Sequence, residues 1–297
     1  MSTSFNVGGD EGGAKPFRTF ALDHELSELR LMMERQGGVL LSDPQDVLSS
    51  KVNEYLELRQ LKSVADLLGR LQTSDTESET LLAHLLDGET AFFRHPMAFS
   101  VFQKQVLPEL FVRKTGDSVS GLRIWSAGCS TGEEAYSIGL SVCEAMNGAR
   151  AAGSVHIVAS DVRQDALAVA ECGVFPRETL QGVPLAMVQS YFESVGAHLL
   201  AKPRLRNLIT FAQMNLARPA FLGRFDCIFC MDVLPHFSSA QRVALTQRLH
   251  LYLEPGGYLF LGDGEKLYTA DVAFHSDKHR NFTLYRKPMA AGARSGR

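Results

Sequence analysis

The stretch LRIWSAGCSTGEEAYS, residues 122–137, joins a short apolar run to a helical pattern through a turn that contains glycine. Leu122 to Ala127 has the length of a buried strand, and Glu133 to Met146 has the apolar spacing of a helix. Gly128 and Gly132 permit a tight turn and let a ligand approach bare backbone just before the helix begins. The stretch predicts a strand–turn–helix unit with a candidate ligand site at the turn, although a purely structural turn would use the same glycines.

The same alternation continues along the chain. Further strands are expected at residues 155–159, 207–212, 225–230, 258–262 and 282–285, and further helices at residues 164–172 and 239–253, the last ended by Pro255 to Gly257. Strands that alternate with helices of about 10–15 residues predict an α/β fold with an open, mostly parallel, doubly wound sheet. In such a sheet, ligands bind at the carboxyl ends of the strands.

The chain before this α/β region has a helical pattern instead. One apolar stripe is formed by Leu48, Val52, Tyr55 and Leu56. Ser63 is a candidate helix N-cap, and the polar stretch Thr73 to Thr80 is expected to interrupt the helical pattern. After Pro96, a further amphipathic helix is marked by Phe99, Phe102, Val106 and Leu110. We predict a disordered tail over 1–19, a small all-helical domain over 20–86, an α/β domain over 87–288 and a second disordered tail over 289–297.

Composition and charge limit the class of protein. Of the 297 residues, 45% are hydrophobic, which is enough for a large buried core. Thirty basic against 33 acidic residues leave a net charge of −3, which argues against nucleic acid as a partner. No apolar run approaches the ~20 residues of a membrane span, and the first residues lack a signal-peptide pattern. We therefore expect a soluble, cytoplasmic protein without direct membrane insertion.

The five cysteines do not suggest a disulfide framework or a metal site. Cys227 and Cys230 form a CxxC, but they lie on a predicted strand, where residues three apart point to opposite faces. Two thiols on opposite faces cannot share a metal ion. We interpret them, together with Cys129, Cys143 and Cys172, as small apolar core residues.

Acidic residues near the strand ends indicate the kind of ligand. Glu133 and Glu134 place negative charge where the pyrophosphate of a dinucleotide would sit, which favours a ligand with a cation over a phosphate. Asp161 ends the second strand and can accept hydrogen bonds from two ribose hydroxyls, although it would also serve as a cap for the next helix. Residues 226–233 belong to another strand and the turn after it, and the end of this strand is expected beside the same ligand site. A nucleoside with a cationic group and no phosphate describes S-adenosylmethionine.

Several strings then match one family in order. They are TAFFR at 90–94, IWSAGCSTGEEAYS at 124–137, ASD at 159–161, MNL at 214–216, FDCIFC at 225–230, LEPGG at 253–257 and TLYRK at 283–287. Together they resemble the chemotaxis receptor methyltransferases, or CheR family, which are protein-glutamate O-methyltransferases. The likeness covers residues 24–288 and is weakest in the helical domain. It implies a Rossmann-like methyltransferase sheet with a short β-hairpin insertion within residues 193–206, where Gly196 can form the turn and Pro203 would leave one ladder donor missing.

The resemblance also implies the site residues. For S-adenosylmethionine these are Gly88, Thr90, Arg94, Gly128, Glu134, Asp161, Asn215, Leu216, Met231 and Asp232. Glu134 would meet the methionine ammonium, and Asp161 would meet the ribose. Arg94 would hold the substrate carboxylate at the reacting end, the alternative being an ordinary surface arginine. Arg94 and His236 are the candidate catalytic residues.

The chain departs from the family pattern at four of these positions, among them Met231, where the family has arginine. Residues 231–237 read MDVLPHF where the family has Arg-Asn-Val-x-Ile-Tyr-Phe. Asp232 therefore replaces an amide, His236 replaces a tyrosine, and Gly88 stands where the family has asparagine. Histidine can still donate a hydrogen bond from a ring nitrogen. These changes bear on the substrate and on turnover more than on the fold.

The expected function is methyl transfer from S-adenosylmethionine to glutamate side chains of a chemoreceptor-like protein, by a monomer. The alternative is an S-adenosylmethionine-binding module of the same fold with another substrate or with lost activity. The methylation segments recognised by this family are acidic helices, and basic residues lie on the helical domain at Lys51, Arg59, Lys62 and Arg70. We expect these residues to meet the substrate, the alternative being a solvated face, since acidic residues are interspersed.

Overall fold

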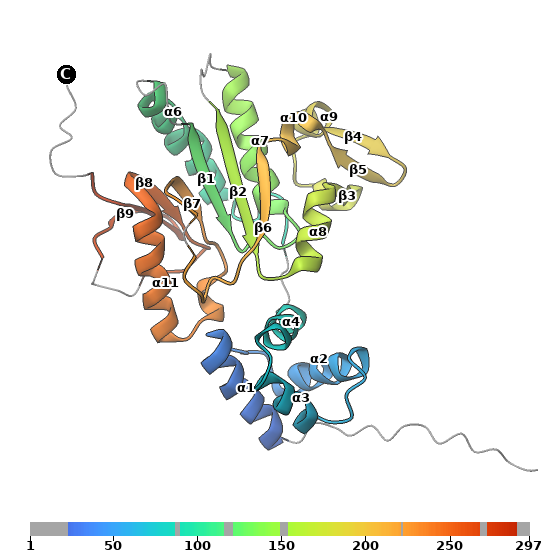
Figure 1. Ribbon diagram of the computed structural model, residues 1–297. Coiled ribbons are helices and arrows are strands. Elements are labelled where there is room, and N and C mark those ends of the chain that lie inside the picture. The colour runs from blue at the N-terminus through green and yellow to red at the C-terminus, as the bar shows by residue number, and fades with distance from the viewer. Residues whose placement is uncertain are drawn as a thin grey trace, which may run out of the picture.

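The computed structural model describes residues 23–86, 90–115, 121–148, 154–220, 222–267 and 272–289 (Figure 1). An N-terminal group of helices lies against the strand ends of a larger α/β region. The predicted tail over 1–19, all but Met289 of the tail over 289–297, and Gly88 lie outside the described residues. Within the described residues, no helix is both long and apolar enough to cross a membrane.

Four helices form the N-terminal group: α1 (Asp23–Gly37), α2 (Gln45–Leu58), α3 (Val64–Leu71) and α4 (Asp75–Leu85). The predicted stripe on α2 is buried along its whole length. Ser63 caps α3 as predicted, because its side chain accepts a hydrogen bond from the backbone N–H of Asp66 at 3.1 Å.

The expected interruption at Thr73 to Thr80 is confirmed only at its start: α3 ends at Leu71 and α4 begins at Asp75, so α4 runs through the rest of this stretch. Ser74 caps α4 by accepting a hydrogen bond from the backbone N–H of Glu77. The Glu77 carboxylate is buried but satisfied, since it accepts from the Tyr55 hydroxyl at 2.8 Å and lies 2.7 Å from the Arg59 guanidinium. Tertiary partners on α2 thus allow a polar segment to be helical.

The main sheet has seven strands in the order β6-β2-β1-β7-β8-β10-β9. Its parallel strands are β1 (Leu122–Ala127), β2 (Val155–Asp161), β6 (Ile209–Gln213), β7 (Phe225–Phe229) and β8 (Leu253–Phe260). At one edge, β9 (His275–His279) and β10 (Phe282–Arg286) are antiparallel. The strand order reverses between β1 and β7, as in a doubly wound sheet, so the predicted α/β class is confirmed.

Helices cover both faces of this sheet. On one face lie α5 (Pro96–Val101), the π-helical turn η1 (Phe102–Val106), α6 (Leu107–Thr115) and α7 (Glu133–Gly148). On the other face lies α11 (Ser239–Tyr252), and the N-terminal helices pack beyond the strand ends (Figure 1). The helix α8 (Gln164–Cys172) follows β2. The expected single helix after Pro96 is therefore divided by a π-helical turn, although its predicted apolar residues are all buried.

The cysteines confirm the strand geometry of the CxxC. Cys227 belongs to the core on the α7 face, whereas Cys230 belongs to the core on the α11 face, and both thiols are free and buried. Cys129 and Cys143 are buried as predicted. Cys172 is exposed, because it is the last residue of α8 and faces outward, so its assignment to the core is wrong.

The Pro255–Gly257 segment does not end a helix, because α11 ends at Tyr252 and β8 begins at the next residue. Leu253 pairs with Phe225, after which the register of β7 and β8 shifts. A Cβ on Gly257 would lie 2.9 Å from the carbonyl oxygen of Glu254, so glycine is needed inside this irregular strand.

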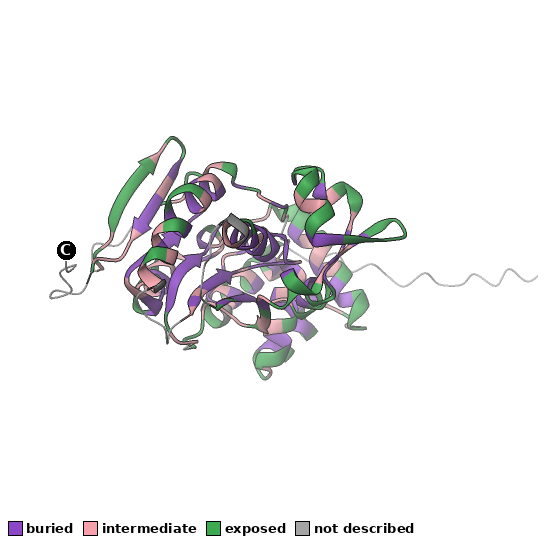
Figure 2. Ribbon diagram, turned by 90° about the horizontal axis from the view of Figure 1, so that it is seen from above, coloured by how far each residue is buried: buried purple, intermediate pink, exposed green. Residues whose placement is uncertain are grey.

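The β-hairpin insertion forms a small second sheet in the order β3-β5-β4, with β3 (Val174–Pro176), β4 (Phe192–Val195) and β5 (His198–Ala201). The turn η2 (Arg177–Leu180) and α9 (Leu185–Tyr191) connect β3 to β4. Gly196 makes the hairpin turn with φ +59°. Pro203 is not in the ladder but begins α10 (Pro203–Arg206), so the expected loss of a ladder donor is wrong. Figure 2 shows exposed residues along this projecting hairpin.

Candidate functional site

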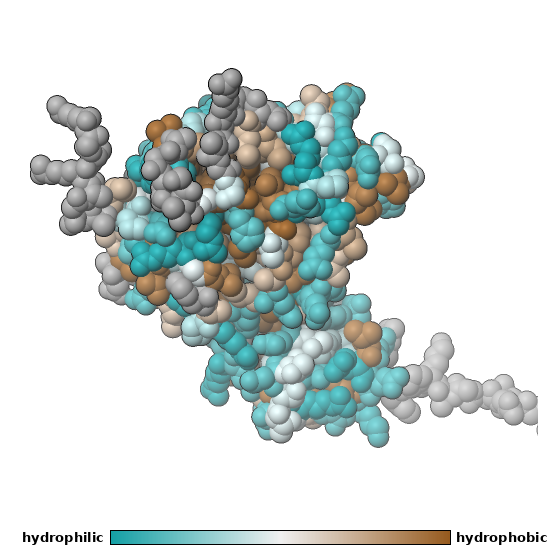
Figure 3. All heavy atoms as spheres, turned by 45° about the horizontal axis from the view of Figure 1, so that its top comes forward, coloured by the Kyte–Doolittle hydropathy of each residue, from teal (hydrophilic) through white to brown (hydrophobic). Residues whose placement is uncertain are grey.

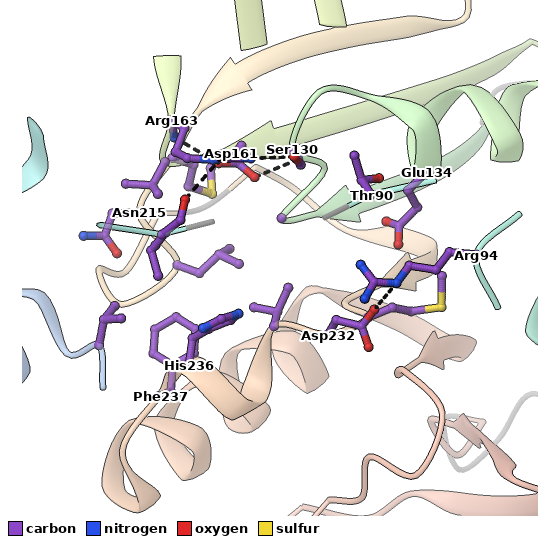
Figure 4. Close-up of a pocket in the computed structure, with 18 of the residues that line it drawn as sticks. Thr90, Arg94, Ser130, Glu134, Asp161, Arg163, Asn215, Asp232, His236 and Phe237 are labelled. Atoms are coloured by element: carbon purple, nitrogen blue, oxygen red, sulfur yellow. Dashed lines mark hydrogen bonds and ion pairs between the residues drawn. The ribbon is translucent and has the colours of Figure 1, made fainter. Parts of the chain in front are cut away.

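A cavity of about 480 Å³ lies at the carboxyl ends of the central strands. The N-terminal helices form one wall of it, through Val39, Leu82 and Leu86. The predicted site residues that the structure describes all line this cavity, namely Thr90, Arg94, Gly128, Glu134, Asp161, Asn215, Leu216, Met231, Asp232 and His236. Figure 4 shows Asp161 and Arg163 on one side of the cavity and Arg94 with Asp232 on the other.

Gly128 is required by the shape of the cavity wall. Its φ is +89°, and a Cβ at this position would lie only 2.6 Å from Cγ2 of Val233. The turn after β1 is further held by hydrogen bonds from the backbone N–H groups of Gly128 and Cys129 to the carbonyl oxygen of Ser160. The glycine therefore serves both the turn and the cavity.

Glu134 lies in the first turn of α7 and presents its carboxylate to the cavity. The Ser126 hydroxyl donates a hydrogen bond to this carboxylate at 2.6 Å. Loss of solvation raises the pKa of Glu134 to about 7, against the smaller lowering effects of Ser126 and His95. A cation bound at this carboxylate would favour its charged form, so the group is suited to a ligand ammonium.

Asp161 lies at the end of β2, where both of its oxygens accept backbone hydrogen bonds. The N–H of Ser130 donates to Oδ2 at 2.8 Å, and the N–H of Arg163 donates to Oδ1 at 2.9 Å. Asp161 thus has the local structural role that was the alternative to ligand binding, since it holds the backbone of two turns. The same carboxylate also lines the cavity. Oδ1 also lies 3.6 Å from Nε of Arg163, whereas Oδ2 keeps a second lone pair for a ligand hydroxyl.

Asn215 and Leu216 lie on the same side of the cavity as Asp161, in the loop after β6, where the backbone N–H of Met214 donates to the carbonyl oxygen of Asp161 (Figure 4). The Asn215 side-chain oxygen accepts a hydrogen bond from the backbone N–H of Ala217 at 2.8 Å, which fixes the loop. Arg248 donates to the carbonyl oxygen of Leu216 at 2.6 Å. The loop is therefore held from its far side, and Asn215 and Leu216 are presented to the cavity.

Arg94 lies on the opposite wall, with 43% of its side chain exposed. Its Nε is 3.4 Å from Oδ2 of Asp232, which makes an ion pair (Figure 4). Phe93, directly before it, has φ +53°, and its backbone N–H donates to the Ser137 hydroxyl at 2.9 Å. A strained backbone held by packing is typical of functional loops. Arg94 thus lines the cavity and pairs with Asp232, while much of its side chain remains exposed.

His236 ends the turn η3 (Leu234–His236), half-buried in the cavity wall. Burial lowers its pKa, and the opposing effects of Asp43 and Asp232 are smaller. The ring is therefore neutral at neutral pH, and it can donate one hydrogen bond and accept another.

Several polar residues in or beside the cavity, Ser130 among them, were not predicted from the sequence. His95 is buried beside Asp232, Arg163 donates to the Ser130 hydroxyl, and Glu265 accepts from the backbone N–H of Asp232 at 3.0 Å. His95 adjoins the FFR string, and this adjacency was a usable signal. Arg163 and Glu265 gave no such signal, because in the sequence each looks like an ordinary surface charge. Their partners at the site come from other segments of the chain.

The chain matches a known family over most of its α/β region. Residues 88–282 match the family described as "CheR methyltransferase, SAM binding domain". Chemotaxis protein methyltransferase 1 of Pseudomonas aeruginosa is 36% identical over 252 residues, which are 82% of this chain and 90% of that protein. Chemotaxis protein methyltransferase Cher2 of Pseudomonas putida is 33% identical over 251 residues, which are 82% and 90% of the two chains. A chemotaxis protein methyltransferase of Vibrio anguillarum is 31% identical over 254 residues, with the same coverages.

The cavity fits the cofactor of this family. Glu134 offers a carboxylate for an ammonium, Asp161 offers acceptors for ribose hydroxyls, and the apolar side chains of Met214 and Leu216 line the same end. Gly128 also lines the cavity, with Val233 packed against it. From the matched domain, the relatives and this donor set, the chain belongs to the CheR family of S-adenosylmethionine-dependent methyltransferases.

Proposed function

We propose that this protein methylates glutamate side chains of a chemoreceptor-like protein, producing glutamate methyl esters in chemotaxis or related signalling. Relatives named chemotaxis protein methyltransferases support this function. The observation that carries it is the position of Arg94, a guanidinium on the cavity wall opposite Asp161 (Figure 4). A planar guanidinium binds a carboxylate with two hydrogen bonds.

The reaction needs no general base, because a glutamate side chain with a pKa of about 4.3 is already ionised at neutral pH. The cofactor supplies a methyl group on a positively charged sulfur. A substrate carboxylate oxygen forms the new bond to the methyl carbon, while the carbon–sulfur bond breaks and its electron pair stays on sulfur. Anion and cation neutralise each other, so a cavity poor in water favours the reaction.

The residues of this chain then act by positioning. Arg94 orients the substrate carboxylate, and the neutral His236 ring donates a hydrogen bond to it. Glu134 and Asp161 hold the two ends of the cofactor. Alignment of this kind is worth several orders of magnitude in rate.

One observation favours a second candidate function. The Asp232 carboxylate lies 3.4 Å from the Arg94 Nε, so the chain itself places an anion against the proposed carboxylate-binding group. A binding module with another substrate, or without activity, would tolerate this pairing.

The helical domain is proposed to meet the acidic substrate helix through a smaller set of residues than expected. Lys51 lies 2.7 Å from Asp43, and Arg59 lies 2.7 Å from Glu77, so both charges serve contacts inside the domain. Lys62 and Arg70 are exposed. On the face shown in Figure 3, the N-terminal helices present a mainly hydrophilic surface.

The direct test uses the whole protein, S-adenosylmethionine labelled on the methyl group, and membranes that contain chemoreceptors. We expect label on a receptor that is released as methanol by mild base, as methyl esters are. The matched control is Arg94→Ala. This variant keeps Glu134 and Asp161, the carboxylates proposed to bind the cofactor, and removes the guanidinium. Cofactor binding by the wild-type protein without base-labile label on any receptor supports the second candidate.

A further inference from the structure

A buried histidine lies between two carboxylates at the reacting end of the cavity. His95 precedes α5, and its side chain is only 9% exposed. Its Nε2 is 2.8 Å from Oδ2 of Asp232. Its Nδ1 accepts a hydrogen bond from the backbone N–H of Asp263 at 3.4 Å when the ring is neutral, and it lies 3.6 Å from Oδ1 of Asp263, which can accept from the charged ring. The two acids follow different strands, β7 and β8, so the ring joins two loops that meet only in the folded protein.

The Asp232 carboxylate that His95 contacts is held in place from several directions. Its Oδ2 is shared, lying 2.8 Å from His95 and 3.4 Å from the Nε of Arg94. Its backbone has φ +60° and donates its N–H to the Glu265 carboxylate at 3.0 Å. A Cβ on Gly262 would lie 2.4 Å from the other side-chain oxygen, Oδ1. Asp232 therefore remains beside Arg94, and its charge must be offset where it lies.

The charges facing His95 come from four elements. The acidic groups are Asp232, Asp263, Glu134 and Glu265, and the basic neighbour is Arg94. The hydrogen bond to Asp232 is the largest influence on the His95 pKa and raises it, although burial opposes this. In return, His95 is the largest influence on the pKa of Asp232 and lowers it. The pair therefore favours a charged ring beside a charged carboxylate.

We propose that His95 is a positioning residue whose protonated ring neutralises Asp232, so that Arg94 keeps its attraction for the carboxylate of the substrate. This role rests on the proposed function, because the incoming group must be an anion. It explains how a site with an aspartate against its arginine can still bind a carboxylate. His95 does not touch the reacting atoms and acts through the shared Oδ2 of Asp232.

The consequence is a dependence of substrate binding on pH. Below the pKa of His95 the ring is charged and offsets Asp232. As the pH rises through that pKa, Asp232 is left as an unbalanced anion beside Arg94 and repels the substrate carboxylate. The KM for the receptor should rise on the order of tenfold, as expected for one unbalanced charge at close range, while kcat changes little.

The first measurement needs no substrate and no turnover. Histidine resonances of the wild-type protein and of Asp232→Asn are titrated by NMR. We expect the pKa of His95 to fall in the variant, because the carboxylate that favours its charged ring is gone. The role assigned to His95 is overturned when its pKa is the same in both proteins.

The second measurement is a rescue experiment on receptor methylation. His95→Gln keeps a hydrogen-bond donor but never carries a charge, so its KM should be high at every pH and lose the pH dependence of the wild type. Adding Asp232→Asn removes the anion, and the double variant should recover a low KM. If the double variant is as impaired as His95→Gln alone, His95 acts only through structure and the assigned role is wrong. Lack of methylation by the wild type would count against the proposed function, while the NMR titration still decides the charge pairing.

Discussion

The backbone N–H of Leu40 donates a hydrogen bond to the carbonyl oxygen of His236 at 2.7 Å. This bond ties the segment after α1 to a predicted catalytic residue nearly two hundred positions later. Val39 forms an isolated antiparallel bridge with Phe237 beside it. The N-terminal helices are therefore part of the cavity wall.

We expect Asp161→Ala to weaken binding of S-adenosylmethionine by ~1.5–3 kcal/mol for each lost hydrogen bond to a charged acceptor. The reason is that Asp161 lines the cavity and has acceptor capacity beyond its two backbone partners. Calorimetric titration checks the affinity. Asp165→Ala, an exposed change in the first turn of α8, is the matched control. Equal affinity of Asp161→Ala and wild type would remove Asp161 from the cofactor site.

Arg94→Ala should lower methyl transfer by orders of magnitude and leave the melting temperature nearly unchanged. The side chain is 43% exposed, so little packing is lost, whereas alignment of the substrate carboxylate depends on it. Initial rates and thermal melts are compared with those of Arg177→Ala, an exposed arginine in η2. Wild-type rates in Arg94→Ala would contradict the assignment.

Cofactor affinity should increase with pH around the pKa of Glu134, which burial raises to about 7. Ionisation of Glu134 supplies the charge that an ammonium needs, so affinity should change about tenfold per pH unit below that pKa. The folding stability of the cofactor-free protein should change with pH in the opposite direction. Protonated Glu134 stabilises the fold fully below its usual pKa of 4.5, and this contribution is lost as the pH rises through about 7. Calorimetry on either side of that pH checks this, and Glu134→Gln should lose the dependence.

Gly128→Ala should destabilise the fold and reduce cofactor binding. A Cβ would lie 2.6 Å from Cγ2 of Val233, and φ +89° is strained for any other residue, which together cost on the order of 1–3 kcal/mol. Adding Val233→Ala relieves the contact but not the backbone strain, so recovery should be partial. Gly182→Ala, where nothing lies within 4 Å of the added Cβ, is the control for thermal melts.

Reversing the charges of Lys62 and Arg70 to glutamate should weaken receptor methylation and its salt dependence without changing stability, because both side chains are exposed. Arg59→Ala should instead lower stability, since it leaves the buried Glu77 carboxylate without its ion pair. Methylation rates at two salt concentrations and thermal melts separate the two effects. Unchanged methylation after the double reversal means that this face is only solvated.

Local patterns in the sequence were sufficient for most of the elements. The bounds of β1 and α8 agree with prediction, because each is set by its own apolar spacing and by the turn residues that flank it. The π-helical turn at Phe102–Val106 was not predictable, because the apolar spacing of this segment suits a regular helix. In β8 the Pro255–Gly257 segment signalled an irregularity, but only the pairing with β7 showed that the strand continues through it.

The sequence by itself determined the doubly wound sheet, the glycine turn and the carboxylates of the cofactor cavity, since each depends on residues close together in the chain. Only the tertiary structure decided what surrounds them. His95, Asp232 and Asp263 meet from three separate segments, and the N-terminal helices close the cavity through Val39 and Leu82. The physical reason is that the protonation state and the role of a charged group depend on the groups around it. Groups distant in the sequence come together only when the chain folds to bury the two faces of the sheet.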